Sequence, residues 1–254
     1  MPSLWFCVPV HGRLPLAAIC LRQLRRTCDA LSEEGIEATA VVIADRDNLE
    51  ELRERTDDVF GFGTIERDNH FVSRRFNDGI QLACDPRYNP RPADYVAPCG
   101  SDDWVDHQIF LDLPGANTVL GFQRISFVRE DGREMTTRFL DYEGGCGIRV
   151  YPRQVMAHRN FRPADEDRQR ACDTSMLLNL RKAHPRLRVE HRDIDPRQIV
   201  DWKSPGIQLN PYGTIEARHR GESFGDPFET LAEVFPADAL DEMSSHYARE
   251  LVAA

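Results

Sequence analysis

Residues 95–106 read YVAPCGSDDWVD, a short apolar run that leads into two adjacent carboxylates, Asp102 and Asp103. Neighbouring like charges at the end of a strand repel each other and destabilise the fold. A divalent cation relieves that repulsion, and aspartate oxygens are hard ligands that suit Mg²⁺ or Mn²⁺. Such an ion can also neutralise a nucleotide diphosphate as it leaves. The alternative is a plain turn, in which Ser101 and Asp102 cap the following segment.

Strand and helix patterns alternate through the residues around and before this segment. Short apolar runs bounded by Gly, Pro or Asp are typical of buried strands, and i, i+3, i+4, i+7 spacing is typical of amphipathic helices. The alternation predicts an α/β fold with a mostly parallel sheet and flanking helices. The expected strands are residues 5–10, 39–44, 60–66 and 94–98, and the expected helices are residues 14–31, 48–55 (capped by Asn48) and 73–84.

Ligands of such sheets bind beyond the carboxyl ends of the strands. Three segments of this chain fall there: residues 9–13, 45–47 and 100–103. All three are polar or contain glycine, so we expect them to share one rim of the sheet and to form a binding site.

The second half of the chain is less regular. We interpret residues 1–214 as one domain, with a nucleotide-binding half (1–105) and an acceptor half (106–214), followed by a helical extension at 215–254. The apolar faces of that extension permit packing on the domain or a homodimer contact. The expected elements are strands at 118–121, 125–128 and 148–150, a helix at 173–183, a loop at 196–212, and short helices at 228–235 and 240–251.

Composition excludes several classes of protein. The 254 residues are 41% hydrophobic, which excludes a disordered chain, and the net charge of −10 disfavours nucleic-acid binding. No apolar run approaches the roughly 18 residues of a membrane span, and no basic segment precedes the first apolar stretch. Seven cysteines without a CxxC pair indicate reduced thiols. We therefore expect a cytoplasmic protein without a membrane span.

The segment YVAPCGSDDWVD resembles the metal-binding segment of GT-A glycosyltransferases of the inverting family-two type. In that family the fourth strand runs into an Asp-x-Asp-Asp sequence, and here Gly100 stands at the first acidic position. The resemblance implies a GT-A-like fold, with Asp102 as a ligand of Mn²⁺ or Mg²⁺ and Asp103 beside it.

Three other segments resemble the same family: FCVPVHGR (6–13), VVIADRDN (41–48) and RRFNDGIQLA (74–83). In the family they contact the nucleotide-sugar donor, and the acid that ends the second strand holds the base. Each residue also has a plain alternative: a helix cap for Asp45, an exposed helix position for Asn77, a satisfied polar side chain for His11. The donor contacts that the resemblance implies are Pro9, Val10, His11, Gly12, Arg13, Asp45, Asn77, Ser101 and Asp102.

An inverting transferase also needs a carboxylate that deprotonates the acceptor hydroxyl. The segment CDTSMLLNLRK (172–182) resembles the family's helix that carries this base, which implies Asp173, with Asp167 as the alternate. Asp173 could equally be only a helix N-cap. Late in the chain, Lys203 is a candidate to bind the donor and to neutralise leaving-group charge, or else an exposed cation.

The resemblance thus implies transfer of a sugar from a nucleotide-diphosphate donor to a glycan or protein hydroxyl, with inversion. Two alternatives stay open. Gly100 in place of an acid keeps a catalytically inactive binding or assembly module in view. A sugar nucleotidyltransferase is less favoured, because HGRLPL (11–16) holds a single glycine and no lysine. Arginine far outnumbers lysine, as in glycosyltransferases of phages of GC-rich bacteria, which would place the protein in a host cytoplasm with a virion protein as acceptor.

Overall fold

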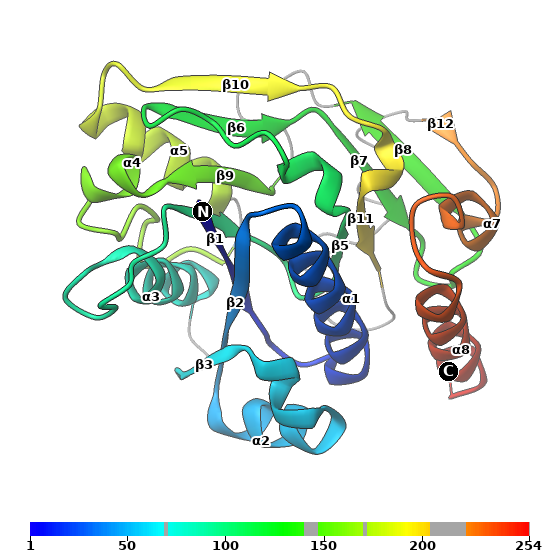
Figure 1. Ribbon diagram of the computed structural model, residues 1–254. Helices are drawn as coiled ribbons and strands as arrows, with labels where there is room; N and C mark the ends of the chain where they lie inside the picture. Colours follow the sequence, from blue (N-terminus) through cyan, green and yellow to red (C-terminus); the bar gives the residue numbers. More distant parts are fainter. Residues whose placement is uncertain (69–70, 140–146, 170–171, 204–221, 254) are drawn as a thin grey trace.

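The computed structural model describes residues 1–68, 71–139, 147–169, 172–203 and 222–253. Two sheets form the framework, with helices packed around them (Figure 1). The strands of the larger sheet, in spatial order, are β10 (Arg188–Arg192), β6 (Thr118–Phe122), β9 (Arg149–Pro152), β4 (Tyr95–Pro98), β1 (Ser3–Pro9), β2 (Glu37–Ala44) and β3 (Gly63–Glu66). Those of the smaller sheet are β12 (Glu222–Ser223), β8 (Met135–Phe139), β7 (Arg124–Val128), β11 (Ile199–Trp202) and β5 (Asp103–Val105).

The larger sheet is mostly parallel, as the sequence pattern predicts. Strand β1 pairs in parallel with β2 and with β4, β2 pairs in parallel with β3, and β6 with β10. Only β9 runs the other way, between β4 and β6. Parallel strands of this kind are covered on both faces and read as continuous apolar runs. Val41, Val42 and Ile43 of β2 are accordingly fully buried.

Helices cover both faces of that sheet. On one face, α1 (Leu14–Glu33) and α2 (Arg46–Arg55) share a core with Leu4, Phe6 and Val8 of β1. On the other face, α3 (Val72–Cys84) and α5 (Cys172–Ala183) share a second core with Cys7 of β1 and with α4 (Arg153–Ala157). Alternate residues of β1 therefore bury in opposite layers, because successive strand side chains point to opposite faces.

The smaller sheet is the main departure from the expected organisation. The loop expected over 196–212 is wrong in part: residues 196–198 form a 3₁₀ turn and 199–202 form β11, while 204–212 lie outside the described residues. Strand β11 joins β7 in parallel and β5 antiparallel. A four-residue strand after a proline carries too little periodicity to be recognised locally, and its pairing partners stabilise it.

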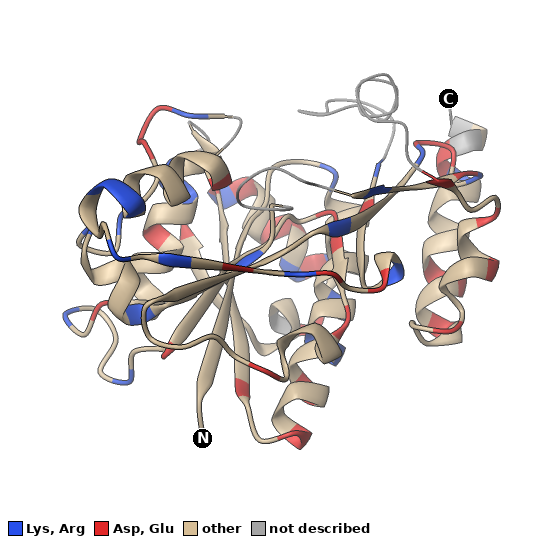
Figure 2. Cartoon of the chain, turned by 90° about the horizontal axis from the view of Figure 1, so that it is seen from above, with Lys and Arg blue, Asp and Glu red and all other residues tan. Residues whose placement is uncertain are grey.

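The C-terminal helices pack on the domain through a third core. Here α7 (Pro227–Leu231) and α8 (Ala237–Ala253) meet the first turns of α1. Figure 2 shows acidic positions along α8, and two of them pair with α1: Asp238 with Arg26 and Glu242 with Arg22. The boundary expected at residue 215 falls outside the described residues, so the division into domain and extension stays a prediction.

The described residues bear on two expectations from composition, which concern membrane spans and the state of the cysteines. None of the helices in this part of the chain has the length and apolar composition that a membrane crossing requires. The six cysteines in the described ranges are buried free thiols.

Candidate active site

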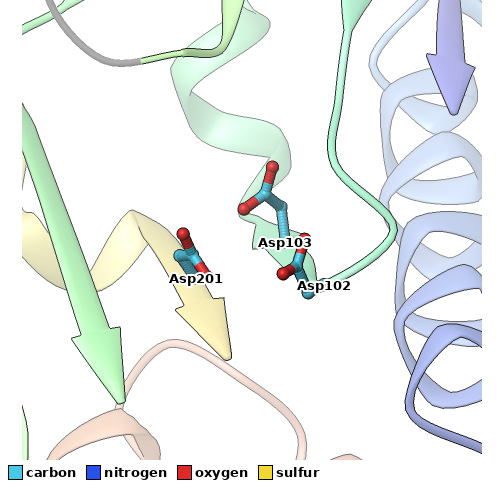
Figure 3. A group of neighbouring side chains, drawn as sticks. All are labelled: Asp102, Asp103 and Asp201. Carbon is cyan, nitrogen blue, oxygen red and sulfur yellow. The ribbon is translucent and has the colours of Figure 1, made fainter. Parts of the chain in front are cut away.

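Three carboxylates meet where the two sheets adjoin (Figure 3). Asp102 and Asp103 follow β4, and Asp201 comes from β11. The register of β5 and β11 places Asp103 opposite Asp201, and the Trp202 amide donates to the Asp102 carbonyl at 2.9 Å. One oxygen of each carboxylate lies within 4.8 Å of the others. We call Asp102, Asp103 and Asp201 the acidic triad.

Gly100 makes room for the triad. A Cβ at this position would lie 2.6 Å from Asp103 Oδ2 and 2.8 Å from Asp102 Oδ1, closer than atoms pack. The Gly100 amide instead donates to Asp103 Oδ2 at 2.7 Å. Position 100 supplies no carboxylate, and the third carboxylate of the triad is that of Asp201, which the sequence pattern does not identify as a ligand.

Arg13 and Lys203 form ion pairs with two members of the triad, Asp102 and Asp201. Arg13 Nη1 donates to Asp102 Oδ2 at 2.9 Å, and Lys203 Nζ donates to Asp201 Oδ2 at 2.6 Å. Burial would raise the pKa of Asp102, but the charges of Arg13 and Lys203 outweigh it and lower this pKa. Burial likewise opposes the charge of Lys203, but Asp201 and Asp102 outweigh it and raise the lysine pKa. Both cations therefore stay charged beside the triad.

Within the triad, the carboxylates oppose one another's ionisation. Burial, followed by the charges of Asp201 and Asp102, raises the pKa of Asp103 well above its ordinary value. Burial raises the pKa of Asp201 to about 6 in spite of Lys203, and Asp102 adds to the rise. Asp201 Oδ1 is buried and has no hydrogen-bond partner among the described residues. Three converging carboxylates, one of which has an oxygen with no hydrogen-bond partner among the described residues, fit a divalent cation such as Mg²⁺ or Mn²⁺.

The predicted donor contacts at the end of β1 lie beside the triad. Arg13 takes a left-handed conformation (φ 48°) as the residue before α1, and this turn directs its guanidinium to Asp102. Ser101 is buried next to the two aspartates. The segment 9–13 and Ser101 are thus brought to the same rim as the triad, as the alternation of strands and helices predicts. Their contact with a donor stays a prediction.

A buried arginine connects this rim to Asp45. Arg75 of α3 is 2% exposed; its Nη1 donates to the Val10 carbonyl at 2.6 Å, and its Nη2 lies 3.8 Å from Asp45 Oδ2. Burial and then the charge of Arg75 lower the pKa of His11, which indicates that His11 also lies near this pair. Val10, His11 and Asp45 therefore form one polar patch, continuous through Arg13 with the triad.

Asp45 also caps a helix, which corrects one expectation. We expected Asn48 to cap a helix over 48–55, but α2 begins at Arg46 and Asp45 is its N-cap. The Asp45 carboxylate accepts from the Asn48 backbone amide at 3.0 Å and from Asn48 Nδ2 at 2.6 Å. Its assignment as a donor contact stays a prediction beside this capping role.

Asn77 takes a position that neither interpretation anticipated. It is fully buried rather than exposed, and its Nδ2 donates to the Ala164 carbonyl and to Glu166 Oε1, both at 2.9 Å. In return the Ala164 amide donates to Asn77 Oδ1 at 2.9 Å. Asn77 thus joins α3 to the segment before α5, and its predicted contact with the donor is not tested by this arrangement.

The two base candidates lie outside the acidic triad. Asp173 sits in the first turn of α5, and the fully buried Arg149 of β9 donates to its Oδ2 at 3.3 Å. This ion pair orients the Asp173 carboxylate. Asp167 is exposed and lines a cavity of about 600 Å³ together with Glu166 and Arg162. The role of either residue as a base stays a prediction.

Comparison with known proteins supports the fold. The sequence matches no protein-family model and no curated protein. Among solved structures, TarS from S. aureus superposes with a TM-score of 0.52 at 13% identity, over 81% of this chain and 37% of TarS. The catalytic domain of Drosophila β1,4-galactosyltransferase 7 gives 0.49 at 13% identity, over 95% of this chain and 84% of the domain. A nucleotidyl transferase from Methanothermobacter gives 0.47 at 11% identity, over 86% and 96%.

Of these three structures, TarS alone has a TM-score above 0.5, and at 13% identity it supports a shared fold and nothing about activity. The expected GT-A-like α/β fold, a mostly parallel sheet with flanking helices, is confirmed.

Proposed function

We propose that this protein is a metal-dependent glycosyltransferase that moves a sugar from a nucleotide-diphosphate donor to an acceptor hydroxyl. The observation that carries the proposal is the acidic triad, placed at the carboxyl end of β4 and flanked by Arg13 and Lys203. Ligands of parallel sheets bind at that edge. Oxygen ligands and adjacent cations together suit a diphosphate better than a neutral substrate.

Asp102, Asp103 and Asp201 would hold Mn²⁺ or Mg²⁺, which supplies positive charge to the departing diphosphate. The protein's own part is to fix this arrangement before the donor arrives. Arg13 orients Asp102, and the Gly100 amide orients Asp103. Lys203 orients Asp201, and its buried ammonium adds a second positive charge beside the diphosphate. Charges held in place by the fold cost little reorganisation during the reaction.

The polar patch of Val10, His11 and Asp45 is the proposed site of the nucleoside. It lies next to the triad through Arg13, so one extended donor can contact both. The buried Arg75 holds the patch in place through the Val10 carbonyl. This assignment keeps Pro9, Gly12, Ser101 and Asn77 as further donor contacts to be tested.

For the chemical step we propose inversion with Asp173 as base. The acceptor oxygen forms a bond to the anomeric carbon as its proton passes to the Asp173 carboxylate. The bond from that carbon to the diphosphate oxygen breaks, and its electron pair leaves with the diphosphate. Arg149, bonded to Asp173, sets the direction of the carboxylate. Asp167 is the alternate base.

The two rival functions are weaker on specific grounds. Gly100 no longer favours an inactive module, because Asp201 supplies a third carboxylate and a side chain at 100 would collide with the carboxylates of Asp102 and Asp103. A nucleotidyltransferase is less favoured because the turn after the first strand, HGRLPL (11–16), holds a single glycine and no lysine to bind a triphosphate. We further propose that the acceptor is a glycan or a protein, such as a virion protein. A cytoplasmic location and a homodimer are also parts of the proposal.

The test is hydrolysis and transfer with a panel of nucleotide sugars, with Mn²⁺ or with EDTA. We expect one donor of the panel to release nucleoside diphosphate, and to do so only when metal is present. The Asp102→Asn variant should not release nucleoside diphosphate from that donor. Release of pyrophosphate from a sugar phosphate and a nucleoside triphosphate would identify the nucleotidyltransferase instead. Absence of any Mn²⁺-dependent nucleotide binding would favour the inactive module.

A further inference from the structure

The C-terminal helix α8 contacts both elements that carry the cations of the site. Its apolar face packs on Leu16, Ile19 and Cys20 of α1, the helix that begins directly after Arg13. At the other side, the Tyr247 hydroxyl of α8 donates to the main-chain carbonyl of Lys203. One helix thus braces the segments that present Arg13 to Asp102 and Lys203 to Asp201.

Both polar groups of the Lys203 main chain, the amide and the carbonyl, are hydrogen-bonded. Its amide donates to the Val128 carbonyl of β7 at 3.1 Å, and its carbonyl accepts from Tyr247. Its side chain is 6% exposed and ends on Asp201 Oδ2. Because the main chain is fixed on both sides, the ammonium has little freedom to leave the triad.

The strand alternation explains why Tyr247 can reach this point. Successive side chains of an extended chain point to opposite faces, so Asp201 and Lys203 lie on the side of Asp102 and Asp103 while Trp202 lies on the side of the helices. Trp202 is fully buried, with its ring 5.0 Å from Trp104 and 5.9 Å from Tyr247 between centroids. Through this aromatic cluster the Tyr247 hydroxyl lies next to Lys203, the residue that follows β11.

Tyr247 is itself closely confined. It is 2% exposed, and a Cβ on Gly132, in the turn between β7 and β8, would lie 2.8 Å from its Cγ. Burial raises the pKa of the Tyr247 phenol, so the hydroxyl stays protonated and can donate.

We propose that Tyr247 is a positioning residue of the transferase: by holding the Lys203 carbonyl, it fixes the Lys203 ammonium against Asp201 and thereby the diphosphate side of the triad. The inference rests on the proposed function and deepens it. It also assigns the C-terminal helices a role in the site rather than that of an appendage.

A double-mutant cycle tests this coupling. The variants are Tyr247→Phe, Lys203→Met and both together, and the probe is inorganic pyrophosphate with Mn²⁺, measured by titration calorimetry. Phenylalanine keeps the ring that packs on Trp202, so the fold should survive. The matched control is Tyr95→Phe, which also removes a tyrosine hydroxyl bonded to a backbone carbonyl, that of Pro114 at 3.0 Å, at the far end of β4.

We expect Tyr247→Phe to weaken pyrophosphate binding by about twofold to tenfold, because the released Lys203 loses part of its contact with the phosphate, and Tyr95→Phe to leave binding unchanged. Added to Lys203→Met, Tyr247→Phe should have no further effect on binding, because it acts through the lysine. Additive effects, or a Tyr247→Phe variant that binds like the control, would overturn the positioning role while leaving the proposed function intact. Failure of the wild-type protein to bind Mn²⁺ and pyrophosphate would contradict both.

Discussion

Asp103 and Asp201 stand opposite each other in the antiparallel strands β5 and β11, so backbone pairing sets the separation of their carboxylates. Residues paired across a sheet keep their spacing better than residues on loops. The repulsion in the triad is therefore built into the framework and is available to be relieved by a bound cation.

The first prediction concerns Asp201 as a metal ligand. Asp201→Asn keeps the side-chain volume but removes a charge from the triad, so we expect Mn²⁺ affinity to fall at least tenfold, as even changes to groups behind the ligands cost about 10–100-fold. Titration calorimetry with Mn²⁺ measures it. Asp193→Asn, an exposed acid paired with Arg124, is the control and should leave the affinity unchanged. Equal affinity in the two variants would remove Asp201 from the metal site.

The second prediction concerns the electrostatic repulsion between the carboxylates of the triad. Asp103→Asn keeps an oxygen that can accept from the Gly100 amide but removes one of three adjacent charges. Without metal, the variant should have a higher free energy of unfolding than the wild type, since burial and the charges of Asp201 and Asp102 oppose the charge of Asp103. Urea denaturation in EDTA measures this difference.

The same variant should lose the stabilisation that metal confers on the wild type. A ligand at 100 times its dissociation constant stabilises the native state by about 2.7 kcal/mol. Thermal unfolding with and without Mn²⁺ compares the two proteins. Two results would contradict a cation site formed by mutually repelling carboxylates. One is a variant less stable than the wild type without metal, and the other is a variant that Mn²⁺ stabilises as much as it stabilises the wild type.

The third prediction concerns the base. Asp173→Asn removes basicity while keeping a side chain that Arg149 can still contact, so turnover should fall about 10²–10⁴-fold, the usual contribution of general-base catalysis. Donor affinity should change little, because Asp173 is not part of the triad. Asp167→Asn is the comparison and should be mild. If Asp167→Asn is inactive and Asp173→Asn is active, the two roles are exchanged; full activity of both would exclude a carboxylate base in this segment.

The fourth prediction concerns the packing around Tyr247. Gly132 and Gly35 both have positive φ, 68° and 83°, but only Gly132 faces another side chain. Alanine at either position should cost the strain of a left-handed residue. At Gly132 it must also displace the Tyr247 ring, so we expect Gly132→Ala to cost about 1–3 kcal/mol more than Gly35→Ala. Urea denaturation gives both values, and equal costs would show that the turn yields without disturbing α8.

Several features of the fold follow from local sequence. The helix over 14–33 and the buried strand at 37–44 were predictable because their periodicity lies within a single element. The carboxyl ends of parallel strands meet at one edge, so the neighbourhood of Arg13, Asp45 and Asp102 was also predictable. The cap of α2 is Asp45, three residues before the expected Asn48: both residue types cap helices well, and only the backbone conformation distinguishes them.

What the amino-acid sequence determined by itself is the alternating α/β framework and the pair Asp102–Asp103 at its edge, since both depend on residues close together in the chain. Only the tertiary structure decided that Asp201 completes the triad, that Asn77 is buried in a joint between α3 and the segment before α5, and that Tyr247 holds Lys203. These contacts join segments far apart in the sequence. Each depends on a strand register or a packed aromatic cluster, and no local pattern encodes which distant residue will occupy the facing position.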